Sequence, residues 1–311
     1  DENKSFPADF IAEGVDQTRG WFYTLHAIAT MTKGTVAYKN VVSNGLVLDK
    51  SGQKMSKRLG NAVDPFKTLE KYGPDATRWY MISNAQPWEN LKFDLAGIEE
   101  VTRKFFGTLF NTYSFFALYA NLDDFRFEEK NLSKETKEID LWILSRLNSL
   151  VRSVENSYND YEPTKAARLI QSFVIDELSN WYVRLCRKRF WKGEMNEDKK
   201  AAYETLFLCL QKVSILMSPI APFYSDLLYS DLSTKEESVH LANFPLFDTE
   251  FIDKNLEYKM GLAQKISSLV LSLRKKTRIK VRQPLFRVLI PSVDTAFESA
   301  IRDVKEIILS E

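Results

Sequence analysis

The chain has 311 residues, a length that predicts about two domains. Its 43 lysines and arginines nearly balance its 42 aspartates and glutamates, which excludes a global field that attracts nucleic acid or membrane, so a polyanion site must be local. The two cysteines fit neither a disulfide framework nor a zinc cluster, and they favour a reducing, cytoplasmic location. We find no signal peptide and no apolar run long enough to span a bilayer. Because the chain starts without Met in sequence that looks folded, we expect a piece of a longer protein.

The distribution of glycine divides the chain into a turn-rich front and a helix-rich back. Seven of the eleven glycines precede residue 75, and only two lie beyond residue 107. In the front, residues 41–49 (VVSNGLVLD) predict a strand, a turn at Gly45 and a second short strand. Asp64 and Pro65 predict the N-cap and first position of a short helix, and Asp75 predicts the cap of another.

From about residue 95 the apolar period changes to 3.6, which predicts four long amphipathic helices. Such helices pack naturally as a bundle, and their stripes are typical of core. Beyond residue 250 we expect a fifth helix from Leu256 to Lys276, a strand over 286–292 and a helix from Ala296. The four stripes are Ile98, Val101, Phe105, Leu109, Thr112 and Phe116; Ile143, Leu147, Leu150, Val154 and Tyr158; Ile170, Phe173, Val174, Leu178, Trp181 and Leu185; and Tyr203, Leu206, Leu210, Val213 and Met217.

Residues 49–61 (DKSGQKMSKRLGN) place three cations between Gly52 and Gly60, namely Lys54, Lys57 and Arg58. Two interpretations stay open, a solvated surface loop and a mobile lid that grips a polyphosphate. In the lid, Lys54 and Lys57 meet charge where it develops and Ser56 donates a hydroxyl hydrogen bond. A Walker-type loop is excluded because the chain has no G-x-x-x-x-G-K-[ST] segment.

Several segments resemble one family. KMSKR (54–58) resembles the KMSKS loop of class I aminoacyl-tRNA synthetases, and AEGVDQTRGWF (12–22) is similar to the matching segment of the isoleucyl-tRNA synthetases. The resemblance covers essentially the whole chain. It continues through NGLVLD (44–49), YGPDATRWY (72–80), NWYVRLCRKRFW (180–191), SVHLANFP (238–245) and IKVRQPL (279–285).

This resemblance implies an α/β plus all-α protein. The second half of a Rossmann-like synthetase fold is expected over 1–95, an anticodon-binding helix bundle over 96–250 and the truncated start of a small α/β junction over 251–311. The implied parent enzyme is a ligase that activates isoleucine with ATP, accompanied by Mg²⁺, and transfers it to tRNA(Ile). Because no H-x-G-H motif and no editing domain occur in the sequence, we expect this piece to be inactive alone.

We further expect a monomer with no membrane contact and no metal site on the protein. The alternative function is a non-catalytic RNA-binding helical module, which would use only the helices and the basic segments.

The resemblance also implies roles for residues. Trp21 is expected to form a wall of the isoleucine pocket, although ordinary core is the alternative, and helix capping is the alternative for Asp16. Arg58 stands where the signature has serine, so that serine's role does not transfer. The implied catalytic residues are Lys54, Ser56 and Lys57, and the implied ATP or adenylate contacts are Glu13, Gly14, Asp16, Gln17, Gly45 and Lys57.

Two basic segments are candidates for tRNA binding. In the first, cations are interleaved with aromatics, a pattern that suits RNA backbone and unstacked bases, while a solvated face over core aromatics is the alternative. The second, 273–285, is the densest basic run, with interdomain docking as its alternative. The first segment holds Trp181, Tyr182, Arg184, Arg187, Lys188, Arg189, Phe190, Trp191 and Lys192, and the second holds Arg274, Lys275, Lys276, Arg278, Lys280 and Arg282.

Overall fold

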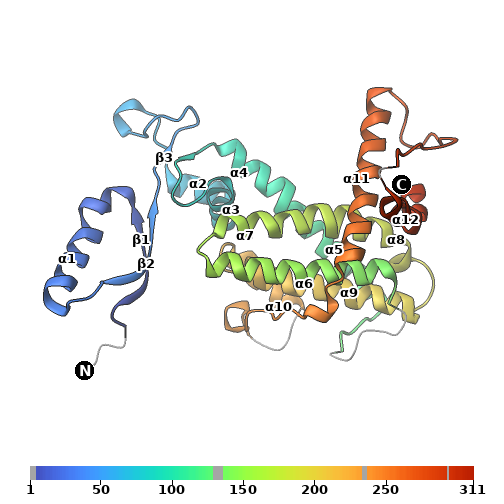
Figure 1. Cartoon of the computed structure of the whole chain (residues 1–311), viewed down its shortest axis with the longest axis horizontal. Coiled ribbons are helices and arrows are strands. Elements are labelled where there is room, and N and C mark those ends of the chain that lie inside the picture. Colours follow the sequence, from blue (N-terminus) through green and yellow to red (C-terminus); the bar gives the residue numbers. More distant parts are fainter. Residues whose placement is uncertain (1–4, 129–135, 233–236, 293) are drawn as a thin grey trace.

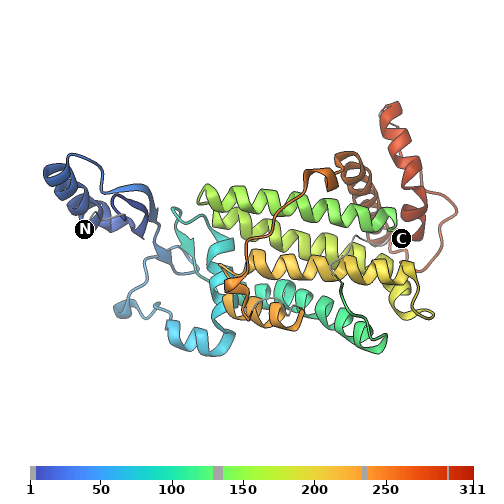
Figure 2. The same ribbon diagram turned by 90° about the horizontal axis from the view of Figure 1, so that it is seen from below.

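The computed structural model of the chain describes residues 5–128, 136–232, 237–292 and 294–311. A small α/β part lies at one end of an elongated molecule and a helix bundle fills the other (Figure 1). Seen from below, the long helices of the bundle run side by side (Figure 2). The predicted class, an α/β part followed by an α-helical bundle, is confirmed. In the ranges described, no helix is both long and apolar enough to cross a membrane.

The N-terminal unit is a strand–helix–strand crossover. β1 pairs with β2 in parallel, with Glu13 opposite Ser43 and Gly14 opposite Asn44. Because the strands are parallel, both carboxyl ends lie at one edge, where α/β sheets commonly bind ligands. The elements are β1 (Ala8–Gly14), η1 (Val15–Arg19, a 3₁₀ helix), α1 (Trp21–Lys33) and β2 (Tyr38–Asn44).

The predicted strand, turn and strand around Gly45 are confirmed, but the two strands belong to different sheets. β2 pairs with β1, whereas β3 pairs in parallel with β4. The chain crosses between the sheets at Gly45, where an added Cβ would lie 2.2 Å from Glu89 O. This region contains β3 (Val47–Leu48), η2 (Lys57–Leu59), α2 (Pro65–Tyr72), α3 (Pro74–Asn84) and β4 (Leu91–Lys92).

Of the two predicted aspartate caps, one is right and one is wrong. Asp64 caps α2, since its Oδ1 accepts from Phe66 N at 3.0 Å. Asp75 does not cap α3, which has Gly73 at its N-cap. Its Oδ2 instead accepts from Tyr224 N at 2.6 Å, at the start of α10 (Pro222–Leu232), because the first N–H groups of any helix need acceptors from outside it.

Most residues of the four predicted stripes lie in or against one large core, while Ile98 belongs to a smaller second cluster, so the bundle is confirmed. The first and third helices are less regular than predicted, because π-helical stretches interrupt them. The elements are α4 (Leu95–Val101), η3 (Thr102–Phe106, π), α5 (Gly107–Leu122), α6 (Glu138–Asn159), α7 (Pro163–Ser172), η4 (Phe173–Val183, π), α8 (Arg184–Trp191), α9 (Glu197–Met217) and α10.

The C-terminal region confirms both predicted helices and corrects the strand. Residues 286–292 form no strand: Phe286 is fully exposed, and no strand in the described chain runs beside it to pair its backbone. The elements are η5 (Val239–Leu241), η6 (Thr249–Phe251), α11 (Lys254–Lys276), α12 (Thr295–Asp303) and α13 (Lys305–Ser310).

Helix α3 is docked on the bundle through hydrogen bonds to helix ends. Trp79 at its centre is fully buried. Carbonyls at the end of α3 accept from α7, and Arg78 donates to carbonyls that follow α9. These bonds are Thr164 Oγ1 to Ile82 O (2.7 Å) and Ala85 O (2.9 Å), Arg168 to Ser83 O (2.8 Å) and Asn84 O (3.0 Å), and Arg78 to Ile220 O (2.8 Å) and Pro219 O (3.0 Å).

The β1–β2 unit meets the bundle through a ring stack. Phe10 of β1 lies parallel to Tyr161, with ring centroids 4.7 Å apart and an interplanar angle of 11°. Tyr161 follows α6 with a φ of 56°, a left-handed conformation that is unusual for a bulky residue.

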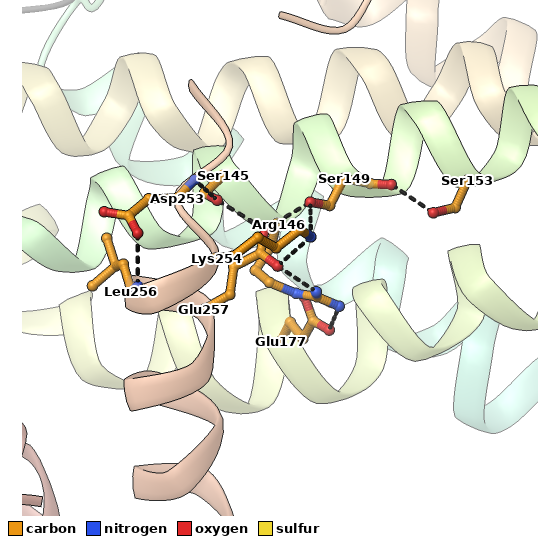
Figure 3. Close-up of polar contacts among 9 residues, drawn as sticks. All are labelled: Ser145, Arg146, Ser149, Ser153, Glu177, Asp253, Lys254, Leu256 and Glu257. Atoms are coloured by element: carbon orange, nitrogen blue, oxygen red, sulfur yellow. Dashed lines mark hydrogen bonds and ion pairs between the residues drawn. The ribbon is translucent and has the colours of Figure 1, made fainter. Parts of the chain in front are cut away.

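One buried carboxylate joins α11 to α6 (Figure 3). Glu257 Oε1 accepts from Ser145 Oγ (2.8 Å) and Ser149 Oγ (2.6 Å), and its Oε2 accepts from Lys254 Nζ (2.8 Å) and Arg146 Nη1 (3.2 Å). Arg146 also holds Glu177 of η4 in a bidentate pair, at 2.7 and 2.9 Å. We call Ser145, Arg146, Ser149, Glu177, Lys254 and Glu257 the Glu257 cluster.

The Glu257 cluster makes the free energy of unfolding depend on pH in the acid range. Burial opposes ionisation, but the hydrogen bonds from Lys254, Ser149 and Ser145 and the charge of Arg146 outweigh it and lower the pKa of Glu257 from 4.5 to about 2. Because the pKa of Glu257 is lower in the folded than in the unfolded chain, its carboxylate contributes its full stabilisation of the fold above pH 4.5. That contribution is lost as the pH falls towards 2. Urea unfolding should therefore show that Glu257→Gln costs less stability at pH 3 than at pH 6. An equal cost at both pH values would contradict this.

Candidate functional site

The predicted adenylate corner lies where β1 ends and α1 begins. Glu13 and Gly14 are the last residues of β1, and the carboxylates of Glu13 and Asp16 are exposed. A Cβ on Gly14 would lie 2.7 Å from Asp16 Oδ1, so glycine lets that carboxylate fold back over the strand end. The corner therefore presents two carboxylates to solvent beside the end of a parallel strand.

The structure decides two alternatives at this corner. Asp16 caps no helix; Gln17 instead accepts from Trp21 N at 3.0 Å with its Oε1 and donates to Asp16 Oδ2 at 2.9 Å. Trp21 is 46% exposed, so it is not an ordinary core residue. Its place in an amino-acid pocket stays a prediction.

The basic loop is closed on itself by Asp49 and Asn61. Asp49 Oδ2 accepts from Asn61 Nδ2 at 2.9 Å, and its Oδ1 accepts from Ser51 N and Gln53 N. Asn61 Oδ1 accepts from Ser56 N at 2.9 Å. The hydrogen bond from Asn61, followed by that from Gln53, lowers the pKa of Asp49. The loop is thus a tied turn with a defined base.

The cations lie on the outside of this tied loop. Lys54 and Arg58 are exposed, and in the described part of the chain neither has an ion-pair partner. Ser56 Oγ accepts from Leu59 N at 3.2 Å, so its hydroxyl proton is not committed by that bond. The backbone of Lys57 begins η2, while its side chain lies outside the described residues. Gly52 and Gly60 have φ of 84° and 66°, the left-handed region where glycine is favoured.

The loop and the corner are joined through the chain and not by direct bonds. Gly45 links β2 to β3, and the loop begins directly after β3. Among the described residues, no hydrogen bond or ion pair connects residues 13–21 with 49–61. Figure 1 draws the loop in light blue beside β3, apart from the β1–β2 unit. Among the residues that the structure describes, no group of three or more His, Cys, Asp or Glu side chains is placed to bind a metal ion.

The first basic segment is more internal than its sequence suggests. Trp181, Tyr182 and Phe190 are buried in the core, which favours the interpretation of core aromatics. Arg189 of this segment is engaged inside the fold, because its side chain is 11% exposed and bidentate to the fully buried Asp140, at 2.7 and 2.8 Å.

The rest of this segment faces solvent. Arg184 lies over the Trp181 ring, 5.6 Å from its centroid, and pairs with Glu311. Arg187 and Lys188 are exposed, and Trp191 is 51% exposed. Any RNA contact of α8 therefore belongs to this outer face.

The second basic segment forms a projecting arm, which we define as residues 268–283. Arg274 braces the arm, since its Nη1 donates to Lys280 O at 3.0 Å and Gln283 O at 2.8 Å. The other cations are exposed, and in the described chain none of them has an ion-pair partner. They are Lys275, Lys276, Arg278, Lys280 and Arg282.

Comparison with known proteins gives two matching family models. One, described as tRNA synthetases class I (I, L, M and V), matches residues 1–94, and another, described as the anticodon-binding domain of tRNA ligase, matches residues 140–290. An isoleucine–tRNA ligase of Bacteroides fragilis is 62% identical over 100% of the chain. The chain belongs to the isoleucyl-tRNA synthetases.

Other relatives agree with this assignment. The isoleucine–tRNA ligase of Cytophaga hutchinsonii is 62% identical over 99% of the chain, and that of Dehalococcoides mccartyi is 46% identical over 98%. The chain spans 28% of the length of the B. fragilis protein and 31% of the D. mccartyi protein. A LeuRS of Agrobacterium radiobacter K84, solved with tRNA and LeuAMS, shares the fold with a TM-score of 0.63 at 17% identity, over 79% of this chain and 29% of its own.

Sequence reasoning missed the residues that tie the basic loop and those that join α11 to α6. Asp49 and Asn61 stand at the two ends of the basic segment, and Asn61 follows Gly60, a common turn signal that could have identified it. Glu257 and Arg146 carry no local signal, because their partners are distant in sequence.

Substitutions of Arg189 and Arg187 should have different effects on the free energy of unfolding. Arg189→Met leaves Asp140 buried without its cation, which should cost ~3–5 kcal/mol of unfolding free energy. Arg187→Met, on the exposed face of the same helix, should change it by less than about 0.5 kcal/mol. Chemical denaturation measures both, and equal costs would contradict the internal role of Arg189.

Asn61 should control the order of the loop. Asn61→Ala removes the bridge between Asp49 and Ser56, so backbone amides of the loop should exchange hydrogen about fivefold to tenfold faster, the factor for one hydrogen bond. Amide exchange at Gln53 and Ser56 measures this. Asn111→Ala is the control, because Asn111 is an exposed residue of α5 in the bundle, away from the loop. Unchanged loop exchange would show that the ties are unimportant.

Proposed function

We propose that this chain is the part of an isoleucine–tRNA ligase that grips the phosphates of ATP and binds tRNA(Ile). The observation that carries the proposal is a tied basic loop with outward cations, in a chain 62% identical to such ligases throughout its length. The complete reaction belongs to the longer protein, since the chain spans 28% of that relative's length.

The loop supplies electrostatic catalysis in this proposal. The carboxylate of isoleucine attacks the α-phosphate of ATP, forming the adenylate as pyrophosphate leaves. Lys54 and Lys57 meet the negative charge that develops on the leaving pyrophosphate, and no proton transfer to them is needed. The exposure of Lys54 supports this role. Mg²⁺ accompanies the ATP phosphates as their counter-ion.

The corner supplies recognition. Glu13, Asp16 and Gln17 offer carboxylate and amide groups suited to the adenylate's ribose hydroxyls and amino group, and Gly14 and Gly45 let the backbone approach closely. The exposed indole of Trp21 offers an apolar wall to a branched side chain. Such a wall separates isoleucine from valine by about one methylene, ~1–3 kcal/mol.

The arm and α8 supply RNA binding. Lys275 and Arg278 on the arm, with Arg187 and Lys188 on α8, are exposed cations suited to phosphates, whereas Arg274 contributes chiefly by holding the arm in shape. The anticodon-binding match over 140–290 supports this half of the proposal. We place the enzyme in the cytoplasm, in accord with two free, buried cysteines. We also propose that it acts as a monomer.

Lys57→Ala in the intact protein tests the catalytic half. Isoleucine-dependent exchange of pyrophosphate into ATP should fall about 10²-fold or more, because one preorganised charge is lost from the transition state. Lys67→Ala on α2 is the matched control and should keep the parent rate. Exchange at the parent rate in Lys57→Ala would refute the role of the loop.

A further inference from the structure

We propose that Glu257 is a positioning residue for RNA binding, whose carboxylate fixes the direction in which α11 carries the arm. The inference rests on the proposed function of the arm. It concerns a residue that faces the bundle, far along the helix from the cations it would direct.

Helix α11 contacts α6, α12 and α13, and all of its buried residues precede residue 268. Leu256, Met260 and Ala263 belong to the core of the bundle, and Ile266 and Ser267 are also buried. Beyond them, Leu269 is 64% exposed. Figure 1 shows the second half of α11 rising clear of the bundle. The arm therefore takes its direction from contacts at the base of the helix.

A small tilt of α11 at its base displaces the arm by several ångströms. Lys276 follows Glu257 by about 28 Å along a helix that rises ~1.5 Å per residue. A tilt of about 10° at Glu257 thus moves the arm by roughly 5 Å, more than the length of a hydrogen bond. Phosphate contacts by the arm would not survive such a displacement unchanged.

The Glu257 cluster is the directional contact at this base. Apolar packing of leucine, methionine and alanine depends little on orientation, whereas the three hydrogen bonds from α6 to the Glu257 carboxylate need defined geometry. Arg146 also binds Glu177, so the cluster fixes the orientation of α11 relative to both α6 and η4. The other ion pair of α11 at its base, Lys259 with Asp303, has a 43% exposed carboxylate and is correspondingly weaker.

Two substitutions and their combination test the inference in the intact protein. Glu257→Gln keeps the shape of the side chain but turns an amide N–H₂ towards Lys254 or Arg146. The second variant neutralises the arm through Lys275→Gln, Arg278→Gln and Lys280→Gln. Binding of a tRNA(Ile) transcript is measured over a series of salt concentrations for each variant and for both together. Glu298→Gln, which removes a carboxylate from an exposed pair with Arg302, is the matched control.

A distance measurement between spin labels reports the position of the arm relative to α6 directly. Spin labels at Asn156→Cys on α6 and Thr277→Cys on the arm can be attached selectively, because Cys186 and Cys209 are buried. In the parent protein the distance distribution should be narrow, and Glu257→Gln should broaden it. If Glu257→Gln does not fold, Ser149→Ala removes one donor to the same carboxylate and should shift both readouts in the same direction.

The expected results are distinct. The neutralised arm should lower the slope of log K against log salt by about 2 to 3. Glu257→Gln should weaken tRNA binding about tenfold in the parent background and not further in the neutralised one, since both changes remove the same contacts. Weakening of equal size in both backgrounds, or no weakening, would overturn the positioning role. A neutralised arm that binds tRNA like the parent would refute RNA binding by the arm itself, and the inference with it.

Discussion

The free backbone groups at helix ends are the constraint on which the arrangement of this chain depends. Helix α3 docks on the bundle because Arg78, Thr164 and Arg168 donate to carbonyls that no helix satisfies internally, and because Asp75 accepts from the first N–H groups of α10. Together with the buried Trp79, these bonds make α3 part of the bundle. The basic loop, which precedes α2 and α3, therefore has a base fixed to the helix bundle.

Sequence patterns predicted the helices of this fold well, because the apolar period of a helix records which face is buried. Asp64 and Pro65 were equally informative, since the cap and the helix are adjacent in the chain. The same reasoning was wrong for Asp75, whose partner Tyr224 lies 149 residues away. It was also wrong for 286–292, because an apolar segment of strand-like composition becomes a strand only when another strand pairs with it.

The candidate site was predictable in its motifs and not in its supports. The basic loop and the corner stand out as short local patterns, but a list of cations does not show which are engaged inside the fold. Arg146, Arg189 and Arg274 hold carboxylates or carbonyls, whereas Lys275, Lys276 and Lys280 face solvent. The division does not follow residue type, since Arg278 and Arg282 are exposed whereas Lys254 binds the buried Glu257 carboxylate. It depends on whether the fold brings a carboxylate or a carbonyl within reach of each cation.

This division explains how a nearly neutral chain can offer sites for polyanions. The formal net charge is +1, so no long-range field guides RNA or ATP. At physiological salt, charges further apart than about 8 Å are screened, so only closely grouped cations without acidic partners act on a phosphate. Internal carboxylates such as Asp140 and Glu257 are satisfied by internal cations, and the negative charge of the chain is in part sequestered there. Exposed cations such as Lys54 on the loop and Lys275 on the arm therefore form separate local groups of positive charge. Asp49 and Asn61 hold the loop, and Arg274 braces the arm.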